Sequence, residues 1–85
     1  MTARILIVED DEPTQRLLQA HLQRFGYEGE TASNARAAIE CLQRGGEFAA
    51  VVLDMMMPEV SGSDVIEVLA AEGNPTPVIV CTPVS

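Results

Sequence analysis

Short apolar runs and helical segments alternate along this chain. Residues 4–9, 49–54 and 78–81 are runs dominated by Ile, Leu, Val and Ala, in which polar and apolar positions do not alternate. Such runs are typical of strands that are covered on both faces. Residues 28–32 form a weaker run, which we expect to be a strand near the edge of the sheet. The pattern therefore predicts four strands.

The segment between the first two strands has the pattern of a helix. Pro13 suits the first turn of a helix, and Asp11 is placed to act as its N-cap. Gly26 marks the end of this helix. We expect the helix to turn its apolar residues toward the sheet, namely Leu17, Leu18, Leu22 and Phe25.

Two later segments also predict helices. Ser33 or Asn34 can cap the first of them, and Ser61 or Ser63 can cap the second. The first has a clear apolar stripe at positions i, i+3, i+4 and i+7. The expected inward residues are Ala35, Ala38, Ile39 and Leu42 in the first, and Val65, Ile66 and Leu69 in the second.

The order of these elements indicates the class of fold. Strand and helix alternate three times, which implies parallel strands joined by right-handed crossovers. The chain contains no linker, low-complexity tract or internal repeat. We therefore expect residues 1–85 to form a single α/β domain.

The composition limits the possible partners and location. The net charge is −8, and the five basic residues do not cluster, which argues against direct binding to nucleic acid. No apolar run approaches the ~20 residues of a membrane span. The charged residues 9–11 end the first apolar run too soon for a signal peptide. We therefore expect a cytoplasmic protein in which Cys41 and Cys81 are reduced, buried thiols.

Two of the predicted strands end in carboxylates. Glu9, Asp10 and Asp11 follow the first strand, and Asp54, 44 positions after Asp10, ends the third. Ligands of open parallel sheets bind beyond the carboxyl ends of the strands. Like charges crowded there repel by roughly 4 kcal/mol per pair at an intermediate dielectric, and a bound Mg²⁺ would relieve that repulsion. Helix capping explains Asp11, but it does not explain two acidic strand ends. The sequence therefore predicts a site for a hard divalent cation.

Three stretches of the chain together resemble the receiver domain of two-component response regulators. They share its order and spacing, and the combination is far more specific than any single stretch. The resemblance implies a flavodoxin-like three-layer fold with a parallel sheet of order 2-1-3-4. The stretches are Ile5-Leu6-Ile7-Val8-Glu9-Asp10-Asp11, then Val52-Leu53-Asp54-Met55-Met56-Met57-Pro58 through Gly62, and then Pro77-Val78-Ile79-Val80-Cys81-Thr82.

The resemblance also implies a role for individual residues. Asp54 would accept a phosphoryl group from a sensor histidine kinase or a phosphotransfer protein, and Thr82 would hydrogen-bond that group. Asp10 would bind Mg²⁺ directly, and Glu9 would support the ion through water. Asp54 and the backbone carbonyl of Met56 would complete the metal site.

The resemblance covers only the first part of a receiver. A complete receiver continues through a helix, a strand and a helix, and the family's lysine lies at the end of that strand, whereas these 85 residues contain no lysine. Thr82-Pro83 resembles the Lys-Pro turn after the fifth strand, but the spacing from Asp54 favours the fourth strand. We expect residues 78–81 to be an exposed strand edge that promotes self-association.

Three functions are compatible with this pattern. The first is a non-enzymatic, Mg²⁺-dependent phosphoacceptor module in two-component signalling. An alternative is a truncated, poorly phosphorylated receiver that acts in protein–protein interaction or dimerisation, which the missing lysine favours. A third is a phosphohydrolase similar to the haloacid dehalogenase family, but that family has a second Asp where this chain has Met56.

Overall fold

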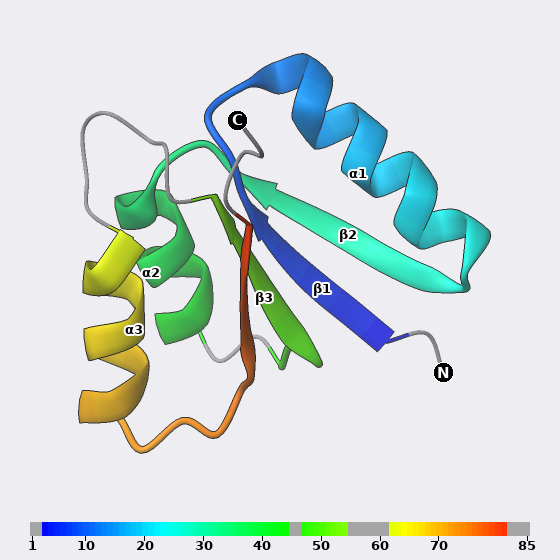
Figure 1. Cartoon of the computed structure of the whole chain (residues 1–85). Coiled ribbons are helices and arrows are strands. Elements are labelled where there is room, and N and C mark those ends of the chain that lie inside the picture. The colour runs from blue at the N-terminus through cyan, green and yellow to red at the C-terminus, as the bar shows by residue number, and fades with distance from the viewer. Residues whose placement is uncertain (1–2, 45–46, 55–61, 82–85) are drawn as a thin grey trace.

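The structure, a computed structural model, describes residues 3–44, 47–54 and 62–81. Four strands and three helices alternate over these residues (Figure 1). The elements are β1 (Ala3–Val8), α1 (Glu12–Arg24), β2 (Tyr27–Ala32), α2 (Ala35–Gln43), β3 (Ala50–Asp54), α3 (Gly62–Ala71) and β4 (Val78–Cys81). The alternation confirms the predicted α/β class, with strand boundaries that differ by one residue or less from the predicted ones.

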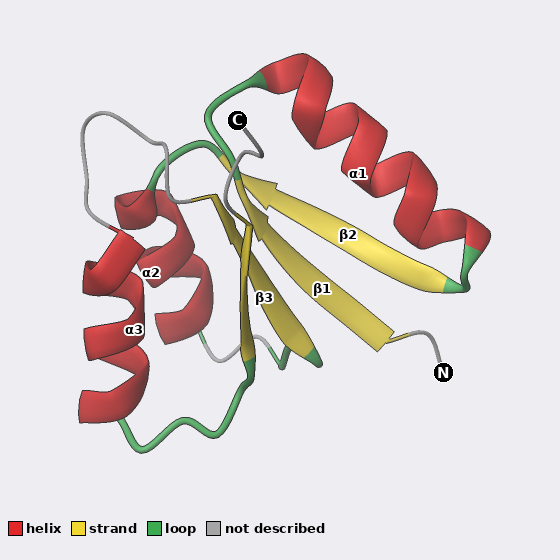
Figure 2. Cartoon of the chain, in the orientation of Figure 1, coloured by secondary structure: helices red, strands yellow, loops and turns green. Residues whose placement is uncertain are grey.

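The four strands form one parallel sheet in the order β2-β1-β3-β4. This is the order that the family resemblance implied, and β2 lies at an edge as expected. Figure 2 shows α1 lying along β2, apart from the neighbouring pair α2 and α3. Successive side chains of a strand point to opposite faces. Leu6 packs with residues of α2 and α3, whereas Ile7 lies beside Leu22 of α1. The helices therefore cover opposite faces of the sheet, which gives three layers.

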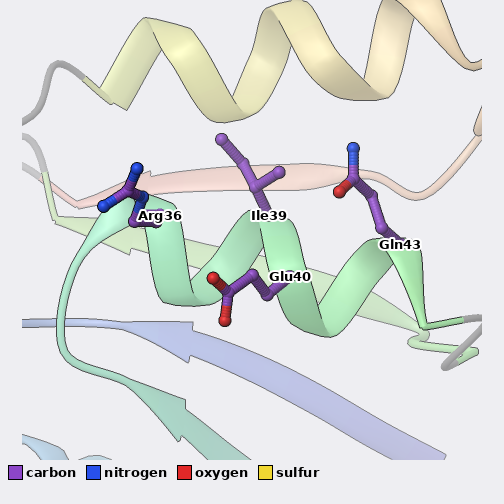
Figure 3. A pocket seen from close by; sticks show the side chains of 4 residues that line it. All are labelled: Arg36, Ile39, Glu40 and Gln43. Carbon is purple, nitrogen blue, oxygen red and sulfur yellow. The ribbon is translucent and has the colours of Figure 1, made fainter.

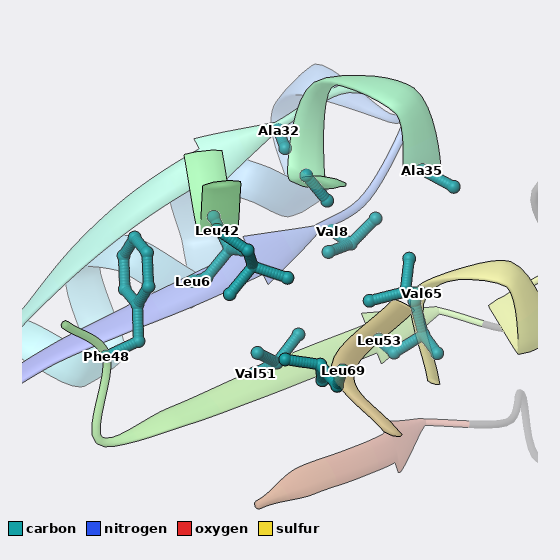
Figure 4. Packing of buried hydrophobic residues seen from close by; sticks show 11 residues of the cluster. Leu6, Val8, Ala32, Ala35, Leu42, Phe48, Val51, Leu53, Val65 and Leu69 are labelled. Carbon is teal, nitrogen blue, oxygen red and sulfur yellow. The ribbon is translucent and has the colours of Figure 1, made fainter. Parts of the chain in front are cut away.

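The larger apolar core lies between the sheet and the α2–α3 pair (Figure 4). The strands contribute Leu6 and Val8 from β1 and Val51 and Leu53 from β3. These positions alternate along each strand, so the four side chains lie on one face of the central pair. The remaining members of the cluster are Ala32, Ala35, Ala38, Leu42, Phe48, Val65 and Leu69. The predicted stripe of α2 is confirmed, although Ile39 is only half-buried.

The face covered by α1 is built differently from the prediction. Leu17 is 58% exposed and Phe25 is 75% exposed, so their expected inward orientation is wrong. Gln15 is buried instead, and Gln19 donates a hydrogen bond to the Gly29 carbonyl at 3.0 Å. The reason is helical geometry, since Leu17 is about 200° around the helix from both glutamines. Leu18 and Leu22 are half-buried.

Capping residues fix the starts of the first two helices. The Asp11 side chain accepts from the Thr14 amide, as an N-cap does, which confirms the predicted start of α1. Asn34, rather than Ser33, caps α2, and its Oδ1 accepts from the Ala37 amide at 2.8 Å. Gly26 follows the end of α1 with φ of +83°, a conformation that favours glycine.

The third helix agrees with the prediction in part. Val65 and Leu69 are buried, but Ile66 is exposed, because it follows Val65 and points around the helix away from the sheet. Since α3 begins at Gly62, Ser63 lies inside the helix and is not its cap, while Ser61 lies outside the described residues.

Two further expectations concern the cysteines and the membrane. Cys41 is a free thiol, half-buried rather than buried, and the side chain of Cys81 lies outside the described part of the chain. Over residues 3–44, 47–54 and 62–81, none of the helices has the length and apolar character needed to cross a membrane.

Replacing Leu6 by alanine should lower the free energy of unfolding by about 3 kcal/mol, because the change leaves a cavity in the larger core. Leu17→Ala is the matched control on the exposed side of α1, and should change that free energy by less than about 0.5 kcal/mol. Urea unfolding followed by circular dichroism measures both. A loss as large for Leu17→Ala as for Leu6→Ala would show that Leu17 is buried and that the outer side of α1 is assigned incorrectly.

Candidate functional site

The carboxyl ends of β1 and β3 lie side by side in the sheet. Val8 of β1 is paired with Leu53 of β3, so Glu9 and Asp54 follow at matching places on neighbouring strands. Asp54 is in turn paired with Cys81 at the end of β4. The backbone thus brings the two acidic strand ends to one edge of the sheet, as the sequence predicted.

Glu9 is held at this edge by its own backbone and side chain. Its amide donates to the Ala32 carbonyl at 3.0 Å, and its Oε1 accepts from the Asp11 amide at 3.1 Å. Its carbonyl accepts from Gln15 Nε2 at 2.5 Å. The residue is only 6% exposed. A buried carboxylate requires such partners, because an uncompensated charge away from water is costly.

Asp10 and Asp11 are both exposed but differ in their contacts. Asp11 Oδ2 accepts from the Thr14 amide at 3.1 Å and from Thr14 Oγ1 at 2.5 Å, so this carboxylate caps α1. Among the residues that the structure describes, the Asp10 side chain makes no hydrogen bond or ion pair. Of the three consecutive acids, Asp10 is therefore the one whose carboxylate is available to a ligand.

Several of the predicted site residues lie beyond the described part of the chain. Met56 and Thr82 are outside the described residues, and so is the side chain of Asp54. Among the side chains that are described, no group of three or more His, Cys, Asp or Glu residues is placed to hold a metal ion. The metal-ligand set thus stays a prediction.

The donor chemistry at this edge fits a hard cation. The groups available are carboxylate and carbonyl oxygens, which Mg²⁺ prefers, whereas the neighbouring methionine thioethers do not suit it. An excess of negative charge at the edge also favours a divalent cation over an anion.

Away from the acidic strand ends, a hollow of about 420 Å³ lies along α2 and is open to solvent. Figure 3 shows Ile39, which lines this hollow, pointing from α2 toward α3. Gln43 Nε2 donates to Glu72 Oε1 at 3.3 Å and so links α2 to the turn after α3. The hollow is lined by Arg36, Ile39, Glu40 and Gln43. This lining has one basic and one acidic residue and no pair of acids, so it offers no catalytic arrangement.

Gln15 is a residue near the site that was not predicted from the sequence. This residue is only 9% exposed, and its amide bonds directly to the backbone of Glu9. The sequence does contain a signal for a polar inward position. Gln15 lies four residues after the N-cap Asp11, and Gln19 follows one turn later, both at positions where an apolar inward face is expected.

Comparison with known proteins agrees with this geometry. A family model described as the response regulator receiver domain matches residues 5–85. The transcriptional regulatory protein SrrA of Staphylococcus aureus is 39% identical over 82 residues, covering 96% of this chain and 33% of SrrA. The transcriptional regulatory protein PcoR of Escherichia coli is 35% identical over 79 residues, covering 93% of this chain and 34% of PcoR. The chain thus spans about a third of the length of these curated relatives.

The fold is also similar to solved receivers. The response regulator protein TrrA from Thermotoga maritima, solved in complex with Mg²⁺-BeF, is 33% identical to this chain with a TM-score of 0.87. That similarity covers 99% of this chain and 72% of the TrrA chain. The shared sheet order, the paired acidic strand ends and the match over nearly the whole chain lead to one conclusion. The chain belongs to the family of response regulator receiver domains of two-component systems.

Proposed function

We propose that this chain accepts a phosphoryl group on Asp54, in a Mg²⁺-dependent reaction, from a sensor histidine kinase or a phosphotransfer protein. The observation that carries the proposal is the pairing of Val8 with Leu53, which sets Glu9 and Asp54 on neighbouring strand ends with Asp10 exposed beside them. The similarity to TrrA, which was solved with Mg²⁺-BeF, supports the same ion at this edge.

Each site residue has a role in this proposal. Asp10 binds the ion directly, Glu9 supports it through water, and Asp54 with the Met56 carbonyl completes the ligand set. Thr82 donates its hydroxyl hydrogen to a phosphoryl oxygen. When bound, Mg²⁺ supplies positive charge that stabilises the negative phosphoryl oxygens.

The chemistry required of the chain itself is limited. A carboxylate oxygen of Asp54 forms a bond to phosphorus while the phosphorus–nitrogen bond of the donor's phosphohistidine breaks, and the electron pair returns to the histidine nitrogen. The product is an acyl phosphate on the chain and an unmodified histidine on the donor. In this proposal the chain is a non-enzymatic, cytoplasmic signalling module that does not itself bind nucleic acid.

These 85 residues lack the lysine that the family places against the phosphoryl group. An ammonium group there contributes a charge-assisted hydrogen bond, which is about twice as strong as a neutral one. Within these 85 residues, only Thr82 and the metal ion are available to stabilise the added charge. We therefore expect a short-lived phosphorylated state when the 85-residue chain is tested by itself.

Mg²⁺ at about ten times its dissociation constant should stabilise the folded chain by about 1.4 kcal/mol, which raises the melting temperature of a domain this small by several degrees. Asp10→Asn should abolish that rise, because it removes a charged ligand. Asp11→Ala is the control. It should lower the free energy of unfolding by about 1 kcal/mol through loss of the N-cap, yet keep the response to Mg²⁺. Thermal melts with and without Mg²⁺ test this, and a response that persists in Asp10→Asn would refute the role of Asp10.

Acetyl phosphate with Mg²⁺ should add one phosphoryl group to the chain, at Asp54, in low yield and with short persistence. The physical reason is the absent ammonium group. Intact-mass measurement over time checks this, with Asp54→Ala as the unlabelled control. Labelling that survives in Asp54→Ala would contradict the assignment of the acceptor. Efficient and durable labelling of the wild type would show that another group replaces the lysine.

Ile79 favours a second candidate function, self-association of this chain. Its side chain is 53% exposed on β4, which is the outer strand of the sheet over the described residues. Strand edges of this kind pair readily with a second chain, and an interface of about 800 Å² per partner is the usual size of a stable complex.

We expect dimers or larger species at micromolar concentration, weakened by Ile79→Lys, which introduces a charge into the interface. Ile66→Lys, at an exposed isoleucine of α3, is the matched control and should leave association unchanged. Analytical ultracentrifugation measures both variants. A wild-type chain that is folded and strictly monomeric would rule out this second function.

A further inference from the structure

A buried glutamine connects α1 to the acidic edge of the sheet. Gln15 is 9% exposed, and among the described residues it and Glu9 are the only buried residues with polar or charged side chains. Its Nε2 donates to the Glu9 carbonyl at 2.5 Å and lies 3.4 Å from Ser33 Oγ. A buried amide is retained at little cost only when such partners are present.

These two contacts join three segments of the chain. Glu9 lies in the loop between β1 and α1, Gln15 lies in the second turn of α1, and Ser33 lies in the loop between β2 and α2. The Glu9 amide also donates to the Ala32 carbonyl, which adjoins Ser33. Both backbone groups of Glu9 are therefore tied, one to the end of β2 and one to α1.

The bond to Gln15 also sets the orientation of the next residue. The carbonyl of Glu9 and the amide of Asp10 belong to a single planar peptide group. By holding that carbonyl, Gln15 fixes the orientation of the whole peptide plane, and so the direction of the backbone at Asp10. The Asp10 side chain itself is exposed and makes no hydrogen bond or ion pair with the described residues, so its place depends chiefly on its backbone.

We propose that Gln15 is a positioning residue for the divalent cation, and that it acts by holding the Glu9–Asp10 peptide in the orientation that presents the Asp10 carboxylate. This inference rests on the proposed Mg²⁺ site. It adds to that site a residue that touches neither the ion nor the phosphoryl group. Because the amide is neutral, it orients the loop without offsetting the negative charge that attracts the cation.

The chain contains a matched control for this role. Gln19 lies one turn further along α1, and its Nε2 donates to the Gly29 carbonyl at 3.0 Å. It is the same type of residue, on the same helix, making the same kind of side-chain to backbone bond. Its acceptor, however, lies within β2 and not at the acidic end of the sheet.

The test compares Gln15→Met with Gln19→Met, since methionine keeps the length of the side chain and removes the donor. Mg²⁺ alone is titrated into each isotope-labelled chain, and the shifts of backbone amide signals give its dissociation constant. Loss of a group that orients a metal ligand commonly weakens metal binding by about 10–100-fold. We expect about a tenfold increase for Gln15→Met, at the low end because Gln15 acts through the backbone, and less than about a twofold change for Gln19→Met.

The outcomes separate this inference from the proposed function. If the wild type binds Mg²⁺ and Gln15→Met binds it equally well, the positioning role is wrong while the metal site stands. Equal weakening in both variants would show a general effect of loosening α1, and would also overturn the role. If the wild type shows no saturable shifts, the metal site fails and the inference fails with it.

Folding is read from the same spectra, through the amide signals of β1 and β3. If Gln15→Met does not fold, Gln15→Asn replaces it, because its amide is one methylene too short to reach the Glu9 carbonyl. The same tenfold weakening is expected for that variant. Unchanged Mg²⁺ binding in a folded Gln15→Asn would overturn the proposal.

Discussion

The pairing of β1 with β3 determines where every acidic residue of the candidate site lies. With Val8 opposite Leu53, both strands end at the same level, and Glu9 and Asp54 come out at one edge of the sheet. A slip of one residue would separate these ends and would also move Leu6 and Val8 from the apolar face to the other. The apolar core therefore fixes the register, and the register in turn gathers the charges. The free energy that offsets the repulsion between these like charges comes from burial of apolar side chains between the sheet and the α2–α3 pair.

The two faces of the sheet are stabilised by different interactions. The face under α2 and α3 is a continuous apolar cluster, in which burial dominates. The face under α1 depends in part on two amide-to-carbonyl hydrogen bonds, from Gln15 and from Gln19. Hydrogen bonds are directional whereas apolar burial is not. The face that holds the acidic loop is thus the one whose geometry is more strictly defined.

Much of the fold could be predicted from the sequence. Unbroken apolar runs mark three of the four strands, Asp11 marks the start of α1, and the stripe of α2 needed only local periodicity. The prediction was wrong for Leu17, Phe25 and Ile66, because counting apolar residues does not show which side of a helix meets the sheet. That side is set in α1 by bonds to the main-chain carbonyls of Glu9 and Gly29, which lie outside the helix, and the apolar pattern along the helix does not contain this information.

The candidate site, like the fold, could be predicted from the sequence only in part. The backbone positions of Glu9, Asp10 and Asp54 followed from strand patterning and are confirmed. The contribution of Gln15 could not be foreseen, since its acceptor is a main-chain carbonyl with no sequence signature. The roles of Met56 and Thr82, which lie beyond the described residues, stay predictions from the family resemblance.

Gly29 of β2 limits how closely α1 approaches the sheet. A Cβ atom at this position would lie 3.0 Å from Ile7 Cδ1 and 3.2 Å from Gln19 Cγ, so either the sheet or α1 would have to yield by a few tenths of an ångström. The separation between helix and sheet is therefore limited by the smallest residue, in the edge strand β2. A larger residue at this position would change the distance of α1 from the sheet, and with it the reach of Gln15 toward Glu9.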